Sequence, residues 1–286
     1  MPENPRISVV TPSFNGATTI RETIQSVLCQ EYPDVEHIVM DGGSTDGTLD
    51  IVKEYAHLRW TSGKDEGHYD AMNKGIALAT GELIVILNAD DCFRAGAFQS
   101  VVAAYAAHPQ WDAWFGDAVY VDGAGKEIYR REEALYDYNV LRYWGDYICH
   151  HTLFVRPAVY RRLGGYRHKD FKNACDYEFI LRLGREHCTV GHVPALLVNY
   201  RFHEMGQSAD VRIMRNMRKE SLQIRREHGA PGGAWGRALS NCYRAKRQFQ
   251  KLLYRGKCDL IPGRWLLRKH MHERARFSSN IGIDRL

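Results

Sequence analysis

Residues 7–16 read ISVVTPSFNG, and this stretch decides the fold. Its first five residues are mostly apolar and β-branched, which is typical of a strand, and Asn15-Gly16 is a turn. Residues 18–30 follow with apolar side chains at helical spacing, namely Ile20, Ile24, Val27 and Leu28. The chain therefore opens with a strand–turn–helix unit.

The same alternation continues to about residue 90. Residues 35–41 read as a second strand, and residues 42–46 as a tight turn with a capping residue that opens a helix. Further segments are a short strand at residues 58–61, a helix at residues 69–79 ended by Gly81, and a strand at residues 83–87. The last is a continuous apolar run, as expected of a strand buried on both faces. This alternation predicts a parallel sheet flanked by helices.

Beyond residue 110 the pattern changes. Residues 111–121 and 127–130, separated by a glycine-rich turn, predict a hairpin. Residues 148–155 and 190–200 read as strands, residues 157–163 and 176–186 as helices, and the chain from residue 212 as basic helix with a break at residues 229–233. We therefore expect an α/β body over residues 1–210, with halves 1–110 and 111–210, and a basic helical C-terminal extension over residues 211–286.

Composition excludes several classes of protein. The 286 residues are 44% hydrophobic and 26% charged, as in ordinary globular proteins. The longest apolar run covers residues 83–87, far short of the roughly 20 residues that a membrane-spanning helix needs. No secretory signal is visible, and the seven cysteines show neither a CxxC pair nor zinc-like spacing. We expect reduced thiols in a cytoplasmic protein, without a disulfide framework or structural zinc.

The net charge of +5 hides a strong division. Residues 1–210 carry 20 Lys+Arg and 29 Asp+Glu, a balance of −9, whereas residues 211–286 carry 19 and 5, a balance of +14. Basic side chains there interleave with Trp235, Phe249 and Trp265, a pattern that suits an anionic membrane surface. Helix packing or homo-oligomerisation is the alternative, and no nucleic-acid-binding motif supports nucleic acid as a partner.

The chemistry is expected beyond the carboxyl ends of the parallel strands, where ligands of open sheets bind. Three groups of residues stand there: Thr11-Pro12-Ser13, Asp41-Gly42-Gly43 and Asn88-Ala89-Asp90-Asp91. The adjacent carboxylates of Asp90 and Asp91 repel each other unless a cation neutralises them. Such hard oxygen ligands suit Mg²⁺ or Mn²⁺. The alternative is that both serve as turn and helix-capping residues.

Three nucleotide-binding or hydrolase motifs are absent. Residues 11–16 do not form the GxGxxG turn of dinucleotide-binding folds, and the chain contains neither GxxxxGK[ST] nor GxSxG. The corresponding classes of protein are excluded.

Five pieces in this order closely resemble the family 2 glycosyltransferases with the GT-A fold. They are ISVVTPSFN at 7–15, DGGSTDGT at 41–48, NADD at 88–91, CDYEFILRL at 175–183 and YRFH at 200–203. Residues 65–75, DEGHYDAMNKG, are similar to those of the subgroup that builds bacterial surface polysaccharides. The resemblance covers about residues 6–208. It implies a Rossmann-like mixed sheet, with a nucleotide-sugar half at residues 1–110 and an acceptor half at residues 111–210.

The resemblance implies a donor site and its metal. Thr11 and Pro12 would contact the base and ribose, and Asp41 would accept a hydrogen bond from a uracil N3–H. The other nucleotide-binding residues would be Ser13, Asp65, Asn73, Asn88, Ala89 and Asp90. The triplet at residues 88–90 matches the D-x-D motif, whose last carboxylate binds the metal. Asp90, with Asp91 beside it and His203 completing the shell, would hold Mn²⁺ or Mg²⁺.

On the acceptor side, the resemblance makes Asp176 the general base. The family inverts configuration in one displacement, so one carboxylate must take the proton of the attacking hydroxyl. Helix capping is a second role for Asp176, compatible with the first. Asp117, His150 and His151 are further candidates for contacts with acceptor or diphosphate. Because adjacent residues on a strand face opposite sides, we expect only one of the two histidines to point into the site.

We therefore expect an inverting, metal-dependent enzyme that moves one sugar from a nucleotide-sugar, a UDP-sugar, to a glycan or lipid-linked acceptor in bacterial surface polysaccharide biosynthesis. It would lie in the cytoplasm, peripheral at the inner face of the membrane. No QxxRW motif occurs, which disfavours a processive synthase. Three alternatives remain: a sugar-1-phosphate nucleotidyltransferase, a non-catalytic nucleotide-sugar or glycan-binding module and, with less support, a glycosidase.

Overall fold

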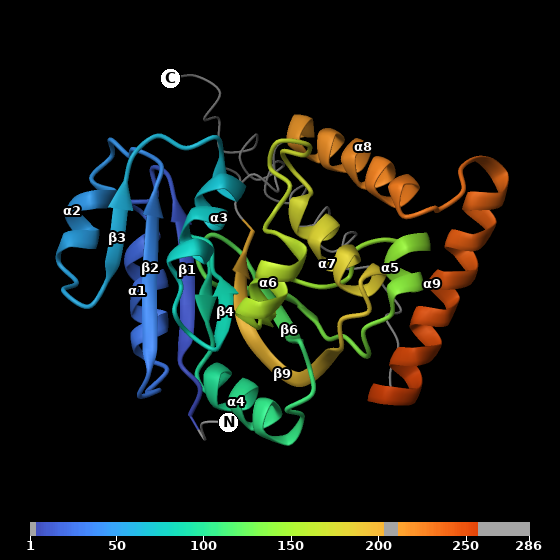
Figure 1. The fold of residues 1–286 in the computed structure, drawn as a ribbon, viewed down its shortest axis with the longest axis horizontal. Helices are drawn as coiled ribbons and strands as arrows, with labels where there is room; N and C mark the ends of the chain where they lie inside the picture. Colours follow the sequence, from blue (N-terminus) through green and yellow to red (C-terminus); the bar gives the residue numbers. More distant parts are fainter. Residues whose placement is uncertain (1–3, 203–210, 257–286) are drawn as a thin grey trace, which may run out of the picture.

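The computed structural model describes residues 4–202 and 211–256. Within these residues, nine strands form one mixed sheet whose order is β3-β2-β1-β4-β8-β6-β9-β5, with β7 paired to β6 (Figure 1). The strands are β1 (Ile7–Ser13), β2 (Val35–Asp41), β3 (Arg59–Ser62), β4 (Leu83–Ile86), β5 (Cys92–Phe93), β6 (Ala113–Val121), β7 (Glu127–Arg131), β8 (Leu153–Val155) and β9 (Val190–Arg201). The expected mixed α/β fold is confirmed.

The first four strands are parallel, as the sequence predicts. β1 lies between β2 and β4, and all seven of its residues are buried. β3 pairs with the outer side of β2 and is exposed along its whole length. Because the four strands run in one direction, their carboxyl ends meet at one edge of the sheet. The turns that follow them therefore lie side by side.

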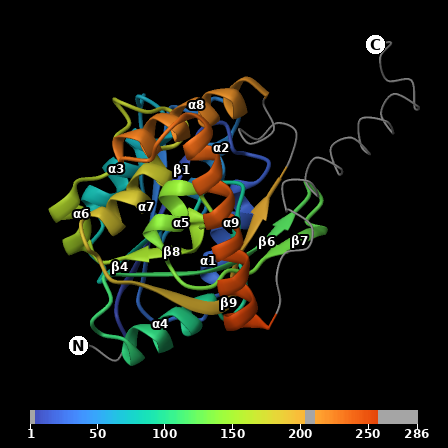
Figure 2. The same ribbon diagram turned by 90° about the vertical axis from the view of Figure 1, so that its right-hand side faces the viewer.

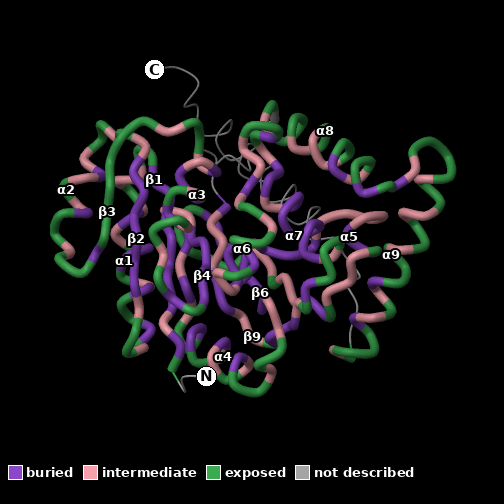
Figure 3. Tube along the Cα trace, in the orientation of Figure 1, coloured by how far each residue is buried: buried purple, intermediate pink, exposed green. Residues whose placement is uncertain are grey.

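Helices cover both faces of the sheet. α1 (Ile20–Leu28), α2 (Thr48–Lys53) and α4 (Ala97–Ala107) pack on one face, through two apolar cores that include Ile24 and Phe98. On the other face, the largest core joins the sheet to α3 (His68–Leu78), α5 (Tyr138–Tyr143), α6 (Pro157–Leu163) and α7 (Cys175–Arg185). Figure 3 shows the strands between these layers as the most continuously buried part of the chain.

The second half of the sheet departs from the sequence prediction in two respects. The two-residue strand β5, which pairs with β9, was not predicted. Residues 148–155 do not form one strand: His150–Thr152 make a 3₁₀ turn, and β8 begins only at Leu153. The hydroxyl of Thr152 donates to the carbonyls of Cys149 and Gly116, which holds this turn against β6. The predicted hairpin of β6 and β7 and the long strand β9 are confirmed.

Two helices follow in the described part of the C-terminal region, α8 (Val211–Glu227) and α9 (Gly233–Arg255), with the predicted break between them. Both lie against the α/β body, on the side of α5 and α7 (Figure 2). Ile224 of α8 is fully buried in the largest core, and Tyr243 of α9 packs against it. Among the helices of the described residues, none combines the length and apolar character that crossing a bilayer requires.

Candidate active site

The turns after β1 and β2 are tied together at the carboxyl edge of the sheet. Asn15 N–H donates to Ser44 Oγ at 2.8 Å, and Asn15 Oδ1 accepts from Thr45 N–H at 3.0 Å. Asn15 has a left-handed backbone, with φ 51°, which asparagine tolerates better than most residues. Asp46 adds a bond from Ala17 N–H at 3.0 Å. The two turns thus form one connected loop structure.

Asp41 is the centre of this loop structure. Its carboxylate is almost buried and accepts from the backbone N–H groups of Gly43 and Ser44, each at 3.0 Å, and from the hydroxyls of Ser44 and Ser62. These four bonds fix the end of β2. The predicted contact of Asp41 with a uracil remains a prediction.

Phe14 lies beside this carboxylate and was given no role in the sequence analysis. Its ring is 67% exposed. A Cβ placed on Gly42 would come within 3.3 Å of that ring and 2.7 Å of Asp65 Oδ2, so all three residues are close neighbours. An exposed aromatic ring at the carboxyl edge is a platform on which a planar base can stack. The sequence does contain a signal for this role, because Phe14 directly follows the first strand.

Thr11, Pro12 and Ser13 end β1 and are all buried. The Thr11 hydroxyl lies 2.9 Å from Nε2 of His37, a buried residue of the neighbouring strand β2. The Thr11 side chain therefore points into the packed protein and away from solvent. Ser13 Oγ finds no hydrogen-bond partner among the described residues. Of these three predicted nucleotide-binding residues, Ser13 has the free polar atom.

The turn after β4 holds the predicted metal ligands. Asp91 N–H donates to the Asn88 carbonyl at 3.1 Å, which closes the turn. Arg201, at the end of β9, donates its backbone N–H to Asp91 Oδ1 at 2.7 Å and its Nε–H to the Asp90 carbonyl at 3.0 Å. Arg201 therefore braces the turn, a role that the sequence analysis did not give it.

Two oxygen donors of this turn fit a hard divalent cation. Asp90 is only partly buried, and Asn88 Oδ1 is buried without a hydrogen-bond partner among the described residues. Carboxylate and amide oxygens are ligands that Mg²⁺ and Mn²⁺ accept. No group of three or more His, Cys, Asp and Glu side chains in the described residues forms a complete protein cage. The predicted third ligand, His203, lies outside the described residues.

Asp91 differs from Asp90. Its side chain is 2% exposed, and Oδ2 lies 3.0 Å from His151 Nδ1 while Oδ1 is engaged by Arg201. Burial, and secondly the charge of Asp90, raises the pKa of Asp91 well above its usual value. Burial also disfavours the charged form of His151, which for a basic group means a lower pKa, about 4. Asp91 is thus occupied inside the protein, whereas Asp90 faces outward more.

Asp176 lies in the first turn of α7 and is held by two side chains. Tyr69 O–H donates to Oδ1 at 2.8 Å, and His150 Nδ1 lies 3.1 Å from Oδ2. Burial by itself would raise the pKa of Asp176, but the hydrogen bonds from His150 and then Tyr69 outweigh it and hold the pKa below its usual value. The N-cap of α7 is Ala174, so Asp176 does not cap the helix.

The two histidines connect the two carboxylate centres. Their rings are 3.8 Å apart, with His150 on Asp176 and His151 on Asp91. Alternation along a strand, the reason for expecting only one of them in the site, does not apply, because the two histidines lie on a 3₁₀ turn and not on a strand. Both Nε2 atoms are buried without a hydrogen-bond partner among the described residues. The turn thus links the donor-side and acceptor-side motifs directly.

Asn73 has a different environment from the one predicted. Its amide donates to the Tyr166 carbonyl at 2.8 Å and accepts from Tyr166 N–H at 2.7 Å, and it lies 3.1 Å from His168 Nδ1. Both ends of the amide therefore hold the loop between α6 and α7 against α3. This loop precedes the helix that carries Asp176.

Asp117 is not in the candidate site. Its carboxylate is 2% exposed and lies on His192 Nε2 at 2.9 Å and on the guanidinium of Arg255 in α9. Glu133 N–H adds a third bond at 2.8 Å. Asp117 was predicted to contact acceptor or diphosphate, and this prediction is corrected. Its side chain on β6 instead faces α9, because the carboxylate is buried there against His192 and Arg255.

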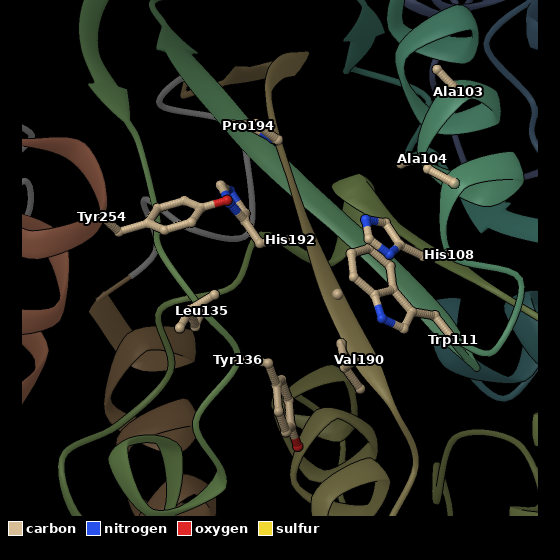
Figure 4. Close-up of a pocket in the computed structure, with 12 residues that line it drawn as sticks. Ala103, Ala104, His108, Trp111, Leu135, Tyr136, Val190, His192, Pro194 and Tyr254 are labelled. Carbon is tan, nitrogen blue, oxygen red and sulfur yellow. The ribbon is translucent and has the colours of Figure 1, made fainter.

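A pocket of about 760 Å³ lies elsewhere on the molecule. Trp111, which precedes β6, His192 and Pro194 of β9, and Tyr254 of α9 line it (Figure 4). None of the predicted site residues belongs to its lining. The candidate active site therefore remains the carboxyl edge, with the turn at residues 88–91 and Asp176, the predicted base.

Comparison with known proteins agrees with this geometry. A family model described as Glycosyl transferase family 2 matches residues 8–164. The PGL/p-HBAD biosynthesis glycosyltransferase of Mycobacterium bovis is 31% identical over 184 residues, which are 62% of this chain and 69% of that protein. The putative glycosyltransferase EpsE of Bacillus subtilis is 30% identical over 173 residues, 58% of this chain and 62% of EpsE.

Solved structures share the fold. TarS 1-349 of S. aureus, in complex with UDP-GlcNAc, has a TM-score of 0.58 at 19% identity, over 86% of this chain and 72% of TarS 1-349. The mannosyltransferase PcManGT of Pyrobaculum calidifontis, in complex with GDP-Man and Mn2+, has a TM-score of 0.56 at 22% identity, over 85% and 75% of the chains. With the family match and the curated relatives, these likenesses show that the chain belongs to glycosyl transferase family 2 and is a glycosyltransferase with the GT-A fold.

Proposed function

We propose that this glycosyltransferase inverts configuration and needs a divalent cation. In this proposal it moves one sugar from a UDP-sugar to a hydroxyl of a glycan or lipid-linked acceptor in bacterial surface polysaccharide assembly. The observation that carries the proposal is the pair of linked carboxylate centres. Asp176 is held by Tyr69 and His150, and the ring of His150 contacts that of His151, which lies on Asp91 in the turn of Asp90.

The donor half supplies binding and orientation. Phe14 offers a stacking surface for the base beside Gly42 and Asp65. Ser13 and Asn88 each carry a buried oxygen that has no hydrogen-bond partner among the described residues. Asp90 and Asn88, with His203 from the closing segment, would hold Mn²⁺ or Mg²⁺, which neutralises the charge on the leaving diphosphate. The complexes of TarS with UDP-GlcNAc and of PcManGT with GDP-Man and Mn2+ support this assignment by analogy of fold.

The acceptor half supplies the base. The carboxylate of Asp176 accepts the hydroxyl proton as the acceptor oxygen forms its bond to the anomeric carbon. The bond from that carbon to the diphosphate oxygen breaks, and its electron pair leaves with the nucleoside diphosphate. One displacement from the opposite side inverts the anomeric centre. The lowered pKa keeps Asp176 ionised, and so ready to accept the proton, across the neutral range.

The proposed place of action is the inner face of the bacterial membrane, where lipid-linked acceptors are presented. Two observations support this placement: the concentration of positive charge in residues 211–286, and the outward apolar side chains of α9.

Calorimetric titration tests the donor site first. UDP, GDP and dTDP are titrated with and without Mn²⁺ into the full chain, into Asp90→Ala, and into Asp50→Ala as a control. Asp50 is an exposed carboxylate on α2 that pairs with Lys53 of the same helix. We expect UDP to bind only with Mn²⁺, at least ten-fold more weakly to Asp90→Ala, and unchanged to Asp50→Ala.

The outcomes separate the parts of the proposal. Preference for GDP or dTDP would replace UDP as the donor nucleotide and leave the mechanism in place. Equal binding without Mn²⁺ would contradict the metal site. If none of the three nucleotides binds, the proposed nucleotide-sugar site is contradicted.

A further inference from the structure

His68 stands between the donor side and the acceptor side of the candidate site. It is the first residue of α3, and the loop that leads to it from β3 crosses the carboxyl edge of the sheet (Figure 1). The same loop contains Asp65, a close neighbour of Phe14. The residue after His68 is Tyr69, whose hydroxyl donates to Asp176. The backbone therefore places His68 between a predicted nucleotide contact and the predicted base.

The side chain of His68 interacts with groups of both sides. Its ring lies against that of Tyr69, with 3.9 Å between the two centroids. The titratable groups that act on its charge are Asp65 of its own loop, Asp176 of α7, and His150 and His151 of the turn before β8. That turn in its own right contacts residues 88–91, through Asp91. His68 is therefore near the base and near the turn that carries the predicted metal ligands.

The imidazole of His68 is available to a ligand. The residue is partly exposed. Within the part of the chain that the structure describes, its ring has aromatic and electrostatic neighbours but no hydrogen-bond partner. Burial lowers the pKa of His68 to about 4, and the charge of Asp176 opposes this shift only in part. At pH 7 the ring is therefore neutral, with one N–H donor and one lone-pair acceptor.

A neutral imidazole suits a sugar hydroxyl better than a phosphate. A hydroxyl both donates and accepts, as the neutral ring does, whereas a diphosphate offers only acceptor oxygens and attracts cations. In the proposed reaction the anomeric carbon lies between the leaving diphosphate, at residues 88–91, and the attacking hydroxyl, at Asp176. The ring of the transferred sugar belongs in this interval, which His68 borders.

We propose that His68 forms a hydrogen bond with a hydroxyl of the transferred sugar and thereby helps to select the sugar. This contact rests on the proposed function, which supplies a nucleotide-sugar without naming its sugar. The contact discriminates because a sugar that lacks this hydroxyl, or presents it in the other configuration, leaves the imidazole without a partner. The competing role for His68 is packing against Tyr69 alone.

Two replacements separate hydrogen bonding from packing. His68→Phe keeps an aromatic ring against Tyr69 and removes the hydrogen bond, whereas His68→Gln keeps a donor and an acceptor and removes the ring. Calorimetry with Mn²⁺ measures the affinity of each full chain for UDP, UDP-glucose, UDP-galactose and UDP-N-acetylglucosamine. For the sugar that the unmodified chain prefers, we expect a loss of roughly ten-fold or more in His68→Phe and of about three-fold or less in His68→Gln. UDP, which has no sugar to contact, should bind all three chains equally.

Deoxy analogues of the preferred sugar locate the contact. Removal of the hydroxyl that His68 binds should weaken the affinity of the unmodified chain by roughly ten-fold and should leave that of His68→Phe almost unchanged. Removal of any other hydroxyl should affect the two chains equally, because those contacts do not involve His68.

His57 provides a matched control. It is exposed, it precedes β3, and its ring also contacts that of a tyrosine, Tyr55. His57→Phe should bind UDP and each UDP-sugar like the unmodified chain. An unchanged circular dichroism spectrum and melting temperature confirm that each variant is folded.

Several results would overturn the proposal. Unchanged affinity of His68→Phe for every UDP-sugar, or equal sensitivity of both chains to every deoxy analogue, would remove the contact. An equal loss for UDP and UDP-sugar would place His68 on the diphosphate, and a loss in His68→Gln alone would make it a packing partner of Tyr69. If GDP or dTDP proves to be the nucleotide, the series uses the sugars of that nucleotide. Failure of the proposed function is distinguishable, because the unmodified chain itself would then bind no nucleotide.

Discussion

Asp176 is held by side chains that are far apart in the sequence. Tyr69, on α3, is 107 residues away, and His150 lies on the turn before β8. Each donates to a different oxygen, so the carboxylate keeps its orientation and its charge although it is mostly buried. A base that is fixed and ionised is ready for proton transfer without reorganisation.

Tyr69→Phe removes one of these two donors. Without this bond the carboxylate is no longer held in one orientation, and misplacement of a reacting group can cost about 100-fold, so we expect kcat to fall roughly ten- to hundred-fold. The carboxylate form also loses a stabilising bond, so the pKa of Asp176 rises toward its usual value. The KM for the donor should stay within about two-fold. Initial rates from pH 4.5 to 9 check these points.

Asp176→Asn provides the comparison. Loss of a general base typically lowers the rate 10²–10⁴-fold, roughly, and should leave nucleotide binding intact. If Tyr69→Phe changes KM and leaves kcat unchanged, Tyr69 serves donor binding and does not position the base.

The acidic residues of the site could be named from the sequence because each stands in a local motif. Their partners could not. Nothing in the local pattern around Tyr69 indicates a partner in α7, and His150 and His151 were misplaced because an apolar stretch followed by a short 3₁₀ turn reads as one strand.

At the scale of elements, α3 shows how closely a helix can approach the sheet. The helical pattern over residues 69–79 is confirmed as His68–Leu78. Gly75 lies inside this helix, where glycine normally weakens helix stability. A Cβ there would come within 2.3 Å of Val10 Cγ1 and 3.1 Å of Met40 Cγ. The glycine is therefore needed for contact with β1 and β2.

Gly75→Ala should destabilise the protein by about 1–3 kcal/mol through overpacking, despite alanine's better helix propensity. Gly63→Ala is the matched control, since no heavy atom lies within 4 Å of a Cβ at that position. Its effect should be close to zero. Urea unfolding followed by fluorescence measures both. A Gly75→Ala chain as stable as the control would mean that α3 shifts on the sheet without loss.

Helix α9 illustrates the limit of periodicity as a guide. The sequence indicates a basic amphipathic helix, but both its apolar and its basic residues could face the body. The orientation of α9 on the body is set by three carboxylates, Asp117, Glu133 and Asp137, because each pairs with a cation of this helix. Burying unpaired carboxylates is costly, and the helix turns its cations toward them.

At the scale of the whole molecule, stability against acid depends on buried histidines in separate regions. His37 lies on β2, His151 beside the donor turn and His228 after α8. Burial lowers the pKa of His37 to about 3 and those of His151 and His228 to about 4. In the unfolded chain a histidine titrates near pH 6.5. Burial has the opposite effect on Asp146, whose pKa rises to about 6.

His37→Gln isolates one of these contributions. Between pH 6.5 and about 3, the unfolded wild-type chain binds a proton at His37 and the folded chain does not, so folding stability falls as the pH falls. The variant lacks this titration. We expect the unfolding free energies of wild type and variant to approach each other by about 1 kcal/mol per pH unit from pH 6 to 4.5. Parallel curves in urea unfolding would contradict the assignment.

The sequence by itself determined the order of strands and helices in the first ninety residues and the edge at which the chemistry lies. Both follow from short-range patterns. Apolar residues that recur every second position define strands, and those that recur about every 3.6 positions define helices. Parallel strands then bring their carboxyl ends together at one edge of the sheet. The motifs at residues 41 and 88–91 therefore pointed to one region of the fold before any contact was known, whereas residue 176 was assigned to the site by family resemblance alone.

Only the tertiary structure decided which side chains meet. It joined His150 to Asp176 and His151 to Asp91, turned Asp117 toward Arg255, and left Trp235, Phe249 and Leu253 of α9 exposed. These pairings depend on which buried charges need a partner. That need is set by segments distant in the chain, so no local pattern of residues records it.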